Sequence, residues 1–287
     1  MTTDNVRLGF IGLGAMGRPM VQNLLKAGFP VIVYDISLKD PDELRSAGAT
    51  IAQSGDDVAG MSDIVQVMVR TEGQVEEVLF GQNGTGVVSN LRKDGIILIH
   101  STISPRACAD AAVKSAKAGI EIVDAPVTGS IKAAAEGNLS FIVGGTPQGI
   151  SRCMFIMNTL GSTVTIVGKA GSAQVAKLIN NMLAGVNSVA IAEGLSLGEA
   201  AGLETELIMA VINAGTGASF MSTHRDIVLE MGRNTDLVGL GYKDLLLALE
   251  EAHQLKVNLP VTAVANQFLA SYHRESQADL TYLDKTK

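Results

Sequence analysis

A glycine-rich loop near the N-terminus has the residue spacing that binds the pyrophosphate of a dinucleotide. Its pattern is Gly-x-Gly-x-x-Gly, and its residues are Gly12, Leu13, Gly14, Ala15, Met16 and Gly17. This chemistry needs glycine for a tight turn, for approach of the backbone to the phosphates and for close helix–strand packing. The apolar run 8–11 precedes the loop and a helical pattern follows it, so a helix N-terminus would offer free N–H groups to the phosphates. In a chain with 31 glycines, this context predicts a nucleotide loop more strongly than the spacing does.

Asp35 ends the next apolar run and bears on which dinucleotide binds. It lies about 20 residues after the loop, where a carboxylate accepts both ribose hydroxyls of NAD and repels the 2′-phosphate of NADP. Ile36 and Ser37 supply no arginine for that phosphate, although Lys39 is close. The residues therefore favour NAD over NADP, and an ordinary turn residue at a strand end is the alternative interpretation of Asp35.

Lys177 is the best candidate for proton transfer in a dinucleotide-dependent reaction. It lies near the start of a long apolar helical stretch, and Asn180 and Asn181 follow it by three and four residues on the same helix face. Such a polar cluster is costly to bury without partners. Beside the positive ring of an oxidised nicotinamide, the pKa of Lys177 should fall towards neutrality, which suits a proton shuttle to a hydroxyl. From these residues alone, a surface lysine remains the alternative.

Other dehydrogenase chemistries lack their residues. None of the four tyrosines has a lysine four residues on, as short-chain dehydrogenases need. His100 is the single histidine near a strand end of the first 170 residues, and a buried structural histidine is the favoured interpretation. No His, Cys, Asp and Glu cluster has metal-ligand spacing, so we expect no metal site.

Apolar runs alternate with helical patterns up to about residue 170. The strand-like runs are 6–11, 31–34, 64–69, 96–99, 120–123, 139–143 and 164–167. Helical patterns such as 19–27 and 106–118 are each followed by a glycine at the position of a C-terminal cap. Continuous apolar strands separated by helices predict a mostly parallel sheet that is covered on both faces.

The pattern changes after Gly171, where strand signals end. Helical segments are expected at 172–201, 204–214, 219–231, 240–254 and 261–270. The sequence therefore predicts an α/β Rossmann-type dinucleotide-binding domain at 1–170, followed by an all-α C-terminal domain at 171–287, joined by a long helix. Because that helix is largely apolar and a small helical domain covers little of it, we expect a homodimer or homotetramer.

Composition and charge exclude several classes of protein. With 47% hydrophobic and 18% charged residues among 287, the chain can bury a sizeable core, so intrinsic disorder is excluded. A net charge of −7 without a basic run argues against a nucleic-acid surface. No predominantly apolar run of about 20 residues is apparent, so we expect no membrane-spanning helix. The absence of a signal-like N-terminus and the reading of Cys108 and Cys153 as small buried hydrophobes predict a cytoplasmic location.

Across essentially its whole length, the chain resembles the β-hydroxyacid dehydrogenase family, which includes 3-hydroxyisobutyrate dehydrogenase and tartronate semialdehyde reductase. The segment 9–20 matches the family's cofactor motif, and 124–130 (Asp-Ala-Pro-Val-Thr-Gly-Ser) is similar to its substrate loop, normally Asp-Ala-Pro-Val-Ser-Gly-Gly. The further matching segments are 101–105, the catalytic segment 177–181 and the lysine motif 243–245.

The resemblance implies a role for each matched residue. Lys177 would be the general acid/base, and Asn181 would orient the substrate, with Asn180 also in the substrate site. The substrate carboxylate would be held by Thr128, Gly129 and Ser130. Beyond the glycine loop and Asp35, the cofactor would be bound by Met68, Val69, Thr102 and Lys243. The implied reaction transfers a hydride between NAD and a short-chain β-hydroxy acid/semialdehyde pair.

The chain departs from the family pattern at two positions of the substrate loop and at one strand end on the expected adenosine side of the cofactor. Thr128 replaces serine, Ser130 replaces glycine, and Arg70 stands where proline is usual, which leaves its role open. The alternatives are an imine reductase, in which the position of Lys177 usually holds Asp or Tyr, an NADP-dependent semialdehyde or glyoxylate reductase, and a non-catalytic dinucleotide-binding protein. The resemblance implies a small carboxylate-bearing substrate.

Overall fold

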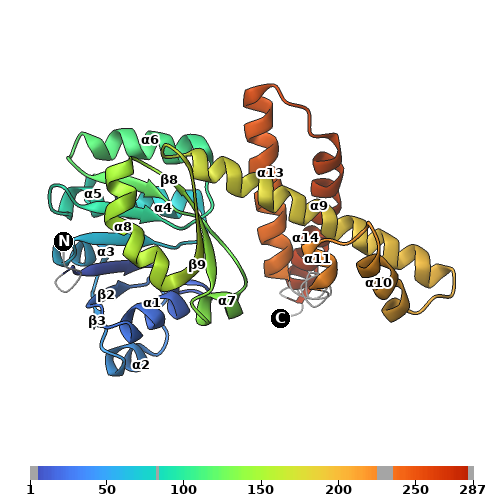
Figure 1. The fold of residues 1–287 in the computed structure, drawn as a ribbon, viewed down its shortest axis with the longest axis horizontal. Helices are drawn as coiled ribbons and strands as arrows, with labels where there is room; N and C mark the ends of the chain where they lie inside the picture. The colour runs from blue at the N-terminus through green and yellow to red at the C-terminus, as the bar shows by residue number, and fades with distance from the viewer. Residues whose placement is uncertain (1–5, 82–83, 225–234, 284–287) are drawn as a thin grey trace. The chain divides into compact units, whose positions relative to one another are not determined.

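The chain forms two compact units in a computed structural model that describes residues 6–81, 84–224 and 235–283. The units are Met1–Lys177 and Leu178–Lys287. They divide inside helix α9 (Ser172–Ala200), which begins just after the predicted domain boundary near residue 170. Figure 1 labels the elements along the chain.

The first unit is built on one sheet, in which nine strands of the described residues have the order β3-β2-β1-β4-β5-β6-β8-β7, with β9 paired to β8. The strands are β1 Leu8–Ile11, β2 Val31–Tyr34, β3 Thr50–Ile51, β4 Ile64–Val67, β5 Ile96–Ile99, β6 Glu121–Asp124, β7 Val127–Thr128, β8 Leu139–Gly144 and β9 Gly161–Gly168. Strands β1 to β6 pair in parallel, whereas β8 runs antiparallel to β6 and β7. The sheet is therefore mostly parallel, as predicted.

Alternate residues of the central strands face two separate hydrophobic cores. In β5, Ile96 and Leu98 belong to one core, while Ile97 and Ile99 belong to the other. All four side chains are fully buried. This two-sided burial explains why the strands are continuous apolar runs, since successive side chains of a strand point to opposite faces.

Helices cover both faces of this sheet. They are α1 Gly17–Lys26, α2 Pro41–Ser46, α3 Gly55–Met61, α4 Glu72–Phe80, α5 Val87–Asn90, α6 Pro105–Ala116, α7 Ile131–Ala135 and α8 Pro147–Leu160. Residues of α1 and α8 pack in the first core, and residues of α3, α4, α5 and α6 pack in the second. The sheet is thus enclosed between two helical layers.

The described part of the second unit is helical. Its helices are the remainder of α9 together with α10 Thr205–Ala214, α11 Phe220–Thr223, α13 Thr235–Leu255 and α14 Pro260–Leu283. Glycines let neighbouring helices approach α9, because a Cβ at Gly185 would lie 2.4 Å from Leu245 Cδ1 and one at Gly198 would lie 2.4 Å from Ile208 Cδ1. Leu245 is fully buried in the resulting core.

The predicted fold class, an α/β Rossmann-type domain followed by an all-α region with a long helix, is confirmed. All seven predicted strands are present. The two-residue strands β3 and β7 were not predicted, because two residues carry no periodicity. The predicted helix 219–231 is α11 over Phe220–Thr223, and residues 225–231 lie outside the described residues.

The expectation that no helix could span a membrane is wrong by length and composition alone. Helix α9 has 29 residues and is apolar enough to pass that test, with 33% of its most apolar window buried. Between Lys177 and Glu193 the helix has no charged residue, and its aliphatic side chains outweigh its asparagines. Core helices of soluble proteins pass the same test.

Candidate active site

The glycine loop lies where the strand order of the sheet reverses. Strand β1 lies between β2 and β4, and the loop leaves the carboxyl end of β1 to enter α1. Such switch points form the ligand crevice of doubly wound sheets. Helix α1 has no side-chain cap at Met16 and no acidic residue in its first turn. Its N-terminal N–H groups therefore suit an anion such as a pyrophosphate.

The three loop glycines serve different purposes. A Cβ at Gly12, whose φ is +99°, would lie 2.2 Å from Met68 O, and one at Gly17 would lie 2.0 Å from Gly12 O. A Cβ at Gly14 would meet no atom within 4 Å. Gly12 and Gly17 are thus required by the packing of the chain itself. Gly14 leaves open space beside the helix N-terminus, which fits a dinucleotide that approaches the backbone closely.

Asp35 is tied to the glycine loop and to its own turn. Its Oδ2 accepts a hydrogen bond from Leu13 N (2.6 Å), and its Oδ1 accepts from Ser37 N (2.7 Å) and Ser37 Oγ (3.1 Å). The next residue, Ile36, is 88% exposed. The carboxylate therefore positions the loop while it lines the crevice.

A cavity of about 460 Å³ adjoins these residues and belongs entirely to the first unit. Its lining includes Gly12, Gly14 and Asp35 of the predicted cofactor site. Met68 and Val69, which the family resemblance assigns to the cofactor, follow β4 and line the cavity, and Arg70, whose role the sequence left open, lines it too. Among the other predicted cofactor residues, Leu13 is buried, Met16 is half-buried and Ala15 is exposed.

The loop after β5 carries Thr102, which the family resemblance places beside the nicotinamide ribose. Ser101 Oγ accepts a hydrogen bond from Val69 N (2.8 Å), which joins this loop to the end of β4. Ile103 N donates to Gln174 Oε1 (3.1 Å), which joins it to the start of α9. The half-buried Thr102 is therefore held between two fixed neighbours.

Lys177 and the predicted substrate loop meet in the first unit. The Lys177 Nζ atom donates to Thr128 Oγ1 at 3.3 Å, and the lysine is only 8% exposed. A snorkelling surface lysine is excluded by this burial. The predicted proton-transfer group thus contacts the first residue of the predicted carboxylate loop.

The substrate loop is fixed on both sides. Thr128 is paired with Ser140 of β8, and Ser130 caps α7 by accepting a hydrogen bond from Ala133 N (3.2 Å). Gly129 between them has a φ of +143°, and a Cβ there would lie 2.9 Å from a Cδ atom of Leu139. Gly129 is therefore required for this backbone, and Gly129 and Ser130 are exposed. The Ser130 hydroxyl still has a proton to donate to an anion.

The remaining predicted residues belong to the second unit. Asn180 Nδ2 donates to Asn181 Oδ1 (3.1 Å), and Asn181 Nδ2 donates to Asp244 Oδ2 (2.6 Å). Lys243 Nζ lies 2.9 Å from Asp244 Oδ1. Asp244 thus links the predicted substrate-orienting Asn181 to the predicted cofactor-binding Lys243. Asp244 lies inside the lysine motif 243–245, for which the resemblance implies a role of Lys243 alone.

His100 is a structural residue of the core. It is 1% exposed, with Nδ1 2.8 Å from Ala125 O and Nε2 3.2 Å from Gln66 Oε1. Burial lowers the pKa of His100 to about 4, so the ring is neutral near pH 7. It is unsuited to be the proton acceptor, as the sequence predicted. Among the described residues, no three His, Cys, Asp or Glu side chains are grouped as metal ligands would be.

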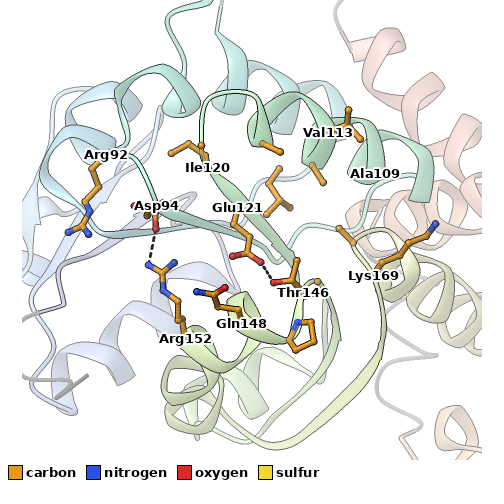
Figure 2. A pocket seen from close by; sticks show the side chains of 17 residues that line it. Arg92, Asp94, Ala109, Val113, Ile120, Glu121, Thr146, Gln148, Arg152 and Lys169 are labelled. Carbon is orange, nitrogen blue, oxygen red and sulfur yellow. Dashed lines mark hydrogen bonds between the residues drawn. The ribbon is translucent and has the colours of Figure 1, made fainter.

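A larger cavity, of about 1040 Å³, lies between α6 and the start of α8 (Figure 2). Two of its charged side chains bond within the chain, because Arg152 Nη2 donates to Asp94 O (2.8 Å) and Thr146 Oγ1 donates to Glu121. It contains none of the predicted site residues. The candidate site therefore lies at the smaller cavity beside the switch point of the sheet, and not at the larger one.

The fold and the glycine loop define an NAD(P)-dependent oxidoreductase. Residues 7–168 match the family model described as the NAD binding domain of 6-phosphogluconate dehydrogenase. Residues 171–284 match the one described as NAD-binding of NADP-dependent 3-hydroxyisobutyrate dehydrogenase. The chain belongs to the β-hydroxyacid dehydrogenase family, and its class of reaction is oxidation or reduction of a hydroxy acid pair.

Three relatives illustrate the similarity. The chain is 35% identical over 270 residues to 2-(hydroxymethyl)glutarate dehydrogenase of Eubacterium barkeri, covering 92% of this chain and 88% of that one. It is 36% identical over 264 residues to 2-hydroxy-3-oxopropionate reductase of Escherichia coli K12, covering 91% and 89%. The solved structure of Mycobacterium tuberculosis 3-hydroxyisobutyrate dehydrogenase with L-serine is similar with a TM-score of 0.81 at 27% identity, covering 93% of each chain.

Proposed function

We propose that the chain interconverts a short-chain β-hydroxy acid and its semialdehyde, with NAD as the cofactor and Lys177 as the general acid/base. The observation that carries this proposal is the 3.3 Å hydrogen bond from Lys177 Nζ to Thr128 Oγ1. It brings the predicted proton acceptor against the predicted carboxylate loop, which fits a substrate that carries a hydroxyl and a carboxylate a few atoms apart.

The chain's own residues would hold the substrate and move its proton. Neutral Lys177 would accept the hydroxyl proton of the substrate in the oxidative direction and return it in the reductive one. The loop 128–130 would bind the carboxylate through backbone N–H groups and hydroxyls. When bound, the nicotinamide would accept or supply the hydride. The glycine loop, Asp35, Met68, Val69 and Thr102 would hold the dinucleotide.

The position of Asp35 supports NAD over NADP. Its carboxylate lines the cavity beside the glycine loop, where it would repel a 2′-phosphate. Arg70 lines the same cavity, so the alternative of an NADP-dependent semialdehyde reductase has a residue in its favour. An imine reductase is disfavoured because a buried lysine occupies the position that usually holds Asp or Tyr in those enzymes.

The substrate is expected to require a carboxylate separated by one or two carbons from the reacting hydroxyl. Hydrogen bonds to a charged group contribute about 1.5–3 kcal/mol each, so two of them predict a loss of roughly 100-fold or more in kcat/KM without the carboxylate. The test measures kcat/KM with NAD and NADP for 3-hydroxyisobutyrate, glycerate, 3-hydroxypropionate, 4-hydroxybutyrate and 2-(hydroxymethyl)glutarate. The matched control is 2-methylpropan-1-ol, which has the carbon skeleton of 3-hydroxyisobutyrate without its carboxylate. Turnover of this alcohol at a comparable kcat/KM would refute the proposal.

We also propose that the protein is a homodimer or homotetramer associated through the second unit. Leu197 of α9 is 75% exposed and Val211 of α10 is 73% exposed. The two helices are in contact at Gly198 and Ile208, and exposed apolar side chains that gather on neighbouring elements mark association surfaces. The double variant Leu197→Lys, Val211→Lys should be a monomer by light scattering while its helical circular dichroism is retained. The matched control is Val113→Lys, which changes an exposed valine of α6 in the first unit. A monomeric unmodified protein at micromolar concentration would contradict the proposal.

A further inference from the structure

Gln174 is a buried amide that joins three elements around the candidate site. It is fully buried, and its Nε2 donates to Asp124 Oδ1 (2.8 Å) and to Ser101 O (3.0 Å). Its Oε1 accepts from Ile103 N (3.1 Å). Both donors of the amide and its acceptor are therefore used. The bonds to Ser101 and Ile103 hold the backbone on each side of Thr102.

Asp124 holds the first turn of the helix that carries Lys177. It ends β6, it is fully buried, and its Oδ2 accepts hydrogen bonds from Gly171 N (3.0 Å) and Gln174 N (3.1 Å). The N–H groups of a first helical turn have no partner within the helix, and a carboxylate there is favoured by the helix dipole. A residue of the sheet thus provides the N-terminal cap of α9.

The segment 124–128 contacts the start of α9 at a second point, four residues after Asp124. Asp124 binds the helix at Gln174, and Thr128 accepts a hydrogen bond from Lys177 one turn later. Gln174 and Lys177 are three residues apart and share a helix face. Two points of attachment fix both the translation and the rotation of this turn relative to the substrate loop.

Burial disfavours the charged form of the Asp124 carboxylate, and the hydrogen bonds that it accepts favour that form. Burial raises the pKa of Asp124 to about 6, while its hydrogen bonds from Gln174 and Gly171 act in the opposite direction. A buried polar network in which each member has a partner rigidifies its surroundings. None of the described residues that bond to Asp124 or Gln174 belongs to the glycine loop. Replacing either residue should therefore leave phosphate binding unaffected.

We propose that Asp124 and Gln174 are positioning residues that hold Lys177, Thr128 and Thr102 together for proton transfer, an inference that rests on the proposed function. They act through the start of α9 and the loop after β5, and they take no proton from the substrate themselves. A misplacement of about 1 Å at a reacting group can lower the rate by about 100-fold. Loss of either residue should therefore affect kcat more than cofactor binding.

The test compares Gln174→Met with a matched buried variant, Gln66→Met. Both glutamines are fully buried in the first unit, and methionine replaces each at similar volume without its hydrogen bonds. Gln66 bonds to the structural His100 and is not part of the site. Both variants are assayed below the melting temperature of the less stable one. On the panel acid with the highest kcat/KM, we expect kcat to fall by roughly 10- to 100-fold in Gln174→Met. NAD affinity should stay close to that of the unmodified protein, and Gln66→Met should keep its kcat.

A double-mutant cycle separates positioning from a general loss of stability. If Gln174 acts through Lys177, most of its effect should vanish in a Lys177→Ala background, where the added change in kcat should be within about twofold. Should Gln174→Met fold poorly, Asp124→Asn replaces it in the same cycle. That variant keeps the volume but replaces one accepting oxygen by an NH2 donor, which cannot accept the hydrogen bonds that Gly171 and Gln174 donate to Asp124. The same split between kcat and NAD affinity is therefore expected.

Three outcomes would overturn the inference. Equal kcat values in Gln174→Met and Gln66→Met would show that the pair has no role in positioning. Multiplicative losses of kcat in the double variant would show that it acts independently of Lys177. Turnover of none of the panel acids by the unmodified protein would refute the proposed function and the positioning role together, whereas an active unmodified protein with equal variants would refute only the latter.

Discussion

Replacing Lys177 by alanine is expected to lower kcat by roughly 10²- to 10⁴-fold, the range typical of general acid–base catalysis. The lysine is 8% exposed and donates to Thr128 Oγ1, so the variant removes a proton carrier from a closed environment. NAD affinity should change little, because the glycine loop and Asp35 are untouched. Steady-state kinetics and isothermal titration with NAD measure the two quantities separately.

Lys177→Arg is the decisive companion variant. Arginine remains protonated and cannot accept the hydroxyl proton, so it should not rescue activity. Asn181→Ala should cost less than either change, because it misplaces the substrate without removing the acceptor. Lys169→Ala is the control, since Lys169 is an exposed lysine of the same unit outside the candidate site. An active Lys177→Arg enzyme would defeat the proposed mechanism.

The double variant Asp35→Asn, Ile36→Arg should shift the ratio of kcat/KM values towards NADP by roughly 10- to 100-fold. It removes a repulsive carboxylate and adds a charged partner for the 2′-phosphate, and a charge-assisted hydrogen bond contributes about 1.5–3 kcal/mol. The 88% exposure of Ile36 leaves room for the arginine side chain. The measurement is kcat/KM for each cofactor at saturating acid.

Replacing Asp35 should also weaken the binding of both cofactors, an effect that cancels in the ratio of their kcat/KM values. Asp35 also accepts hydrogen bonds from Leu13 N and Ser37 N, and asparagine can satisfy these less well. Both cofactors should therefore bind less tightly, but to the same extent. Ile36→Arg alone is the control that separates the added charge from the lost carboxylate. A preference for NADP in the unmodified protein would refute the argument from Asp35.

The sheet could be predicted because each central strand is buried on both faces. A fully apolar run such as Ile96–Ile99 is visible in the sequence without knowledge of its neighbours. Strand β7 has only two residues, and it exists because Val127 and Thr128 pair with Phe141 and Ser140. Such pairing depends on contacts between distant segments and leaves no local pattern.

The candidate site was predictable where a residue type is tied to a fixed spacing, as in the glycine loop. Asp124 and Gln174 were missed as a pair because they are 50 residues apart, and nothing local in the sequence indicates that the strand residue caps the helix. The contact of Asn181 with Asp244, 63 residues away, was missed for the same reason. A signal was available at Asp124, since a carboxylate that ends an apolar strand needs donors.

The two cysteines are free and fully buried, one in each core of the sheet. Burial raises the pKa of Cys153 to about 12 and that of Cys108 above its usual range as well. Thiol reagents attack the thiolate, so neither native cysteine should react in the folded protein. A single cysteine introduced at the exposed Lys39 could thus carry a fluorophore beside the dinucleotide crevice. The protein is a ready background for site-specific labelling, without prior removal of its own thiols.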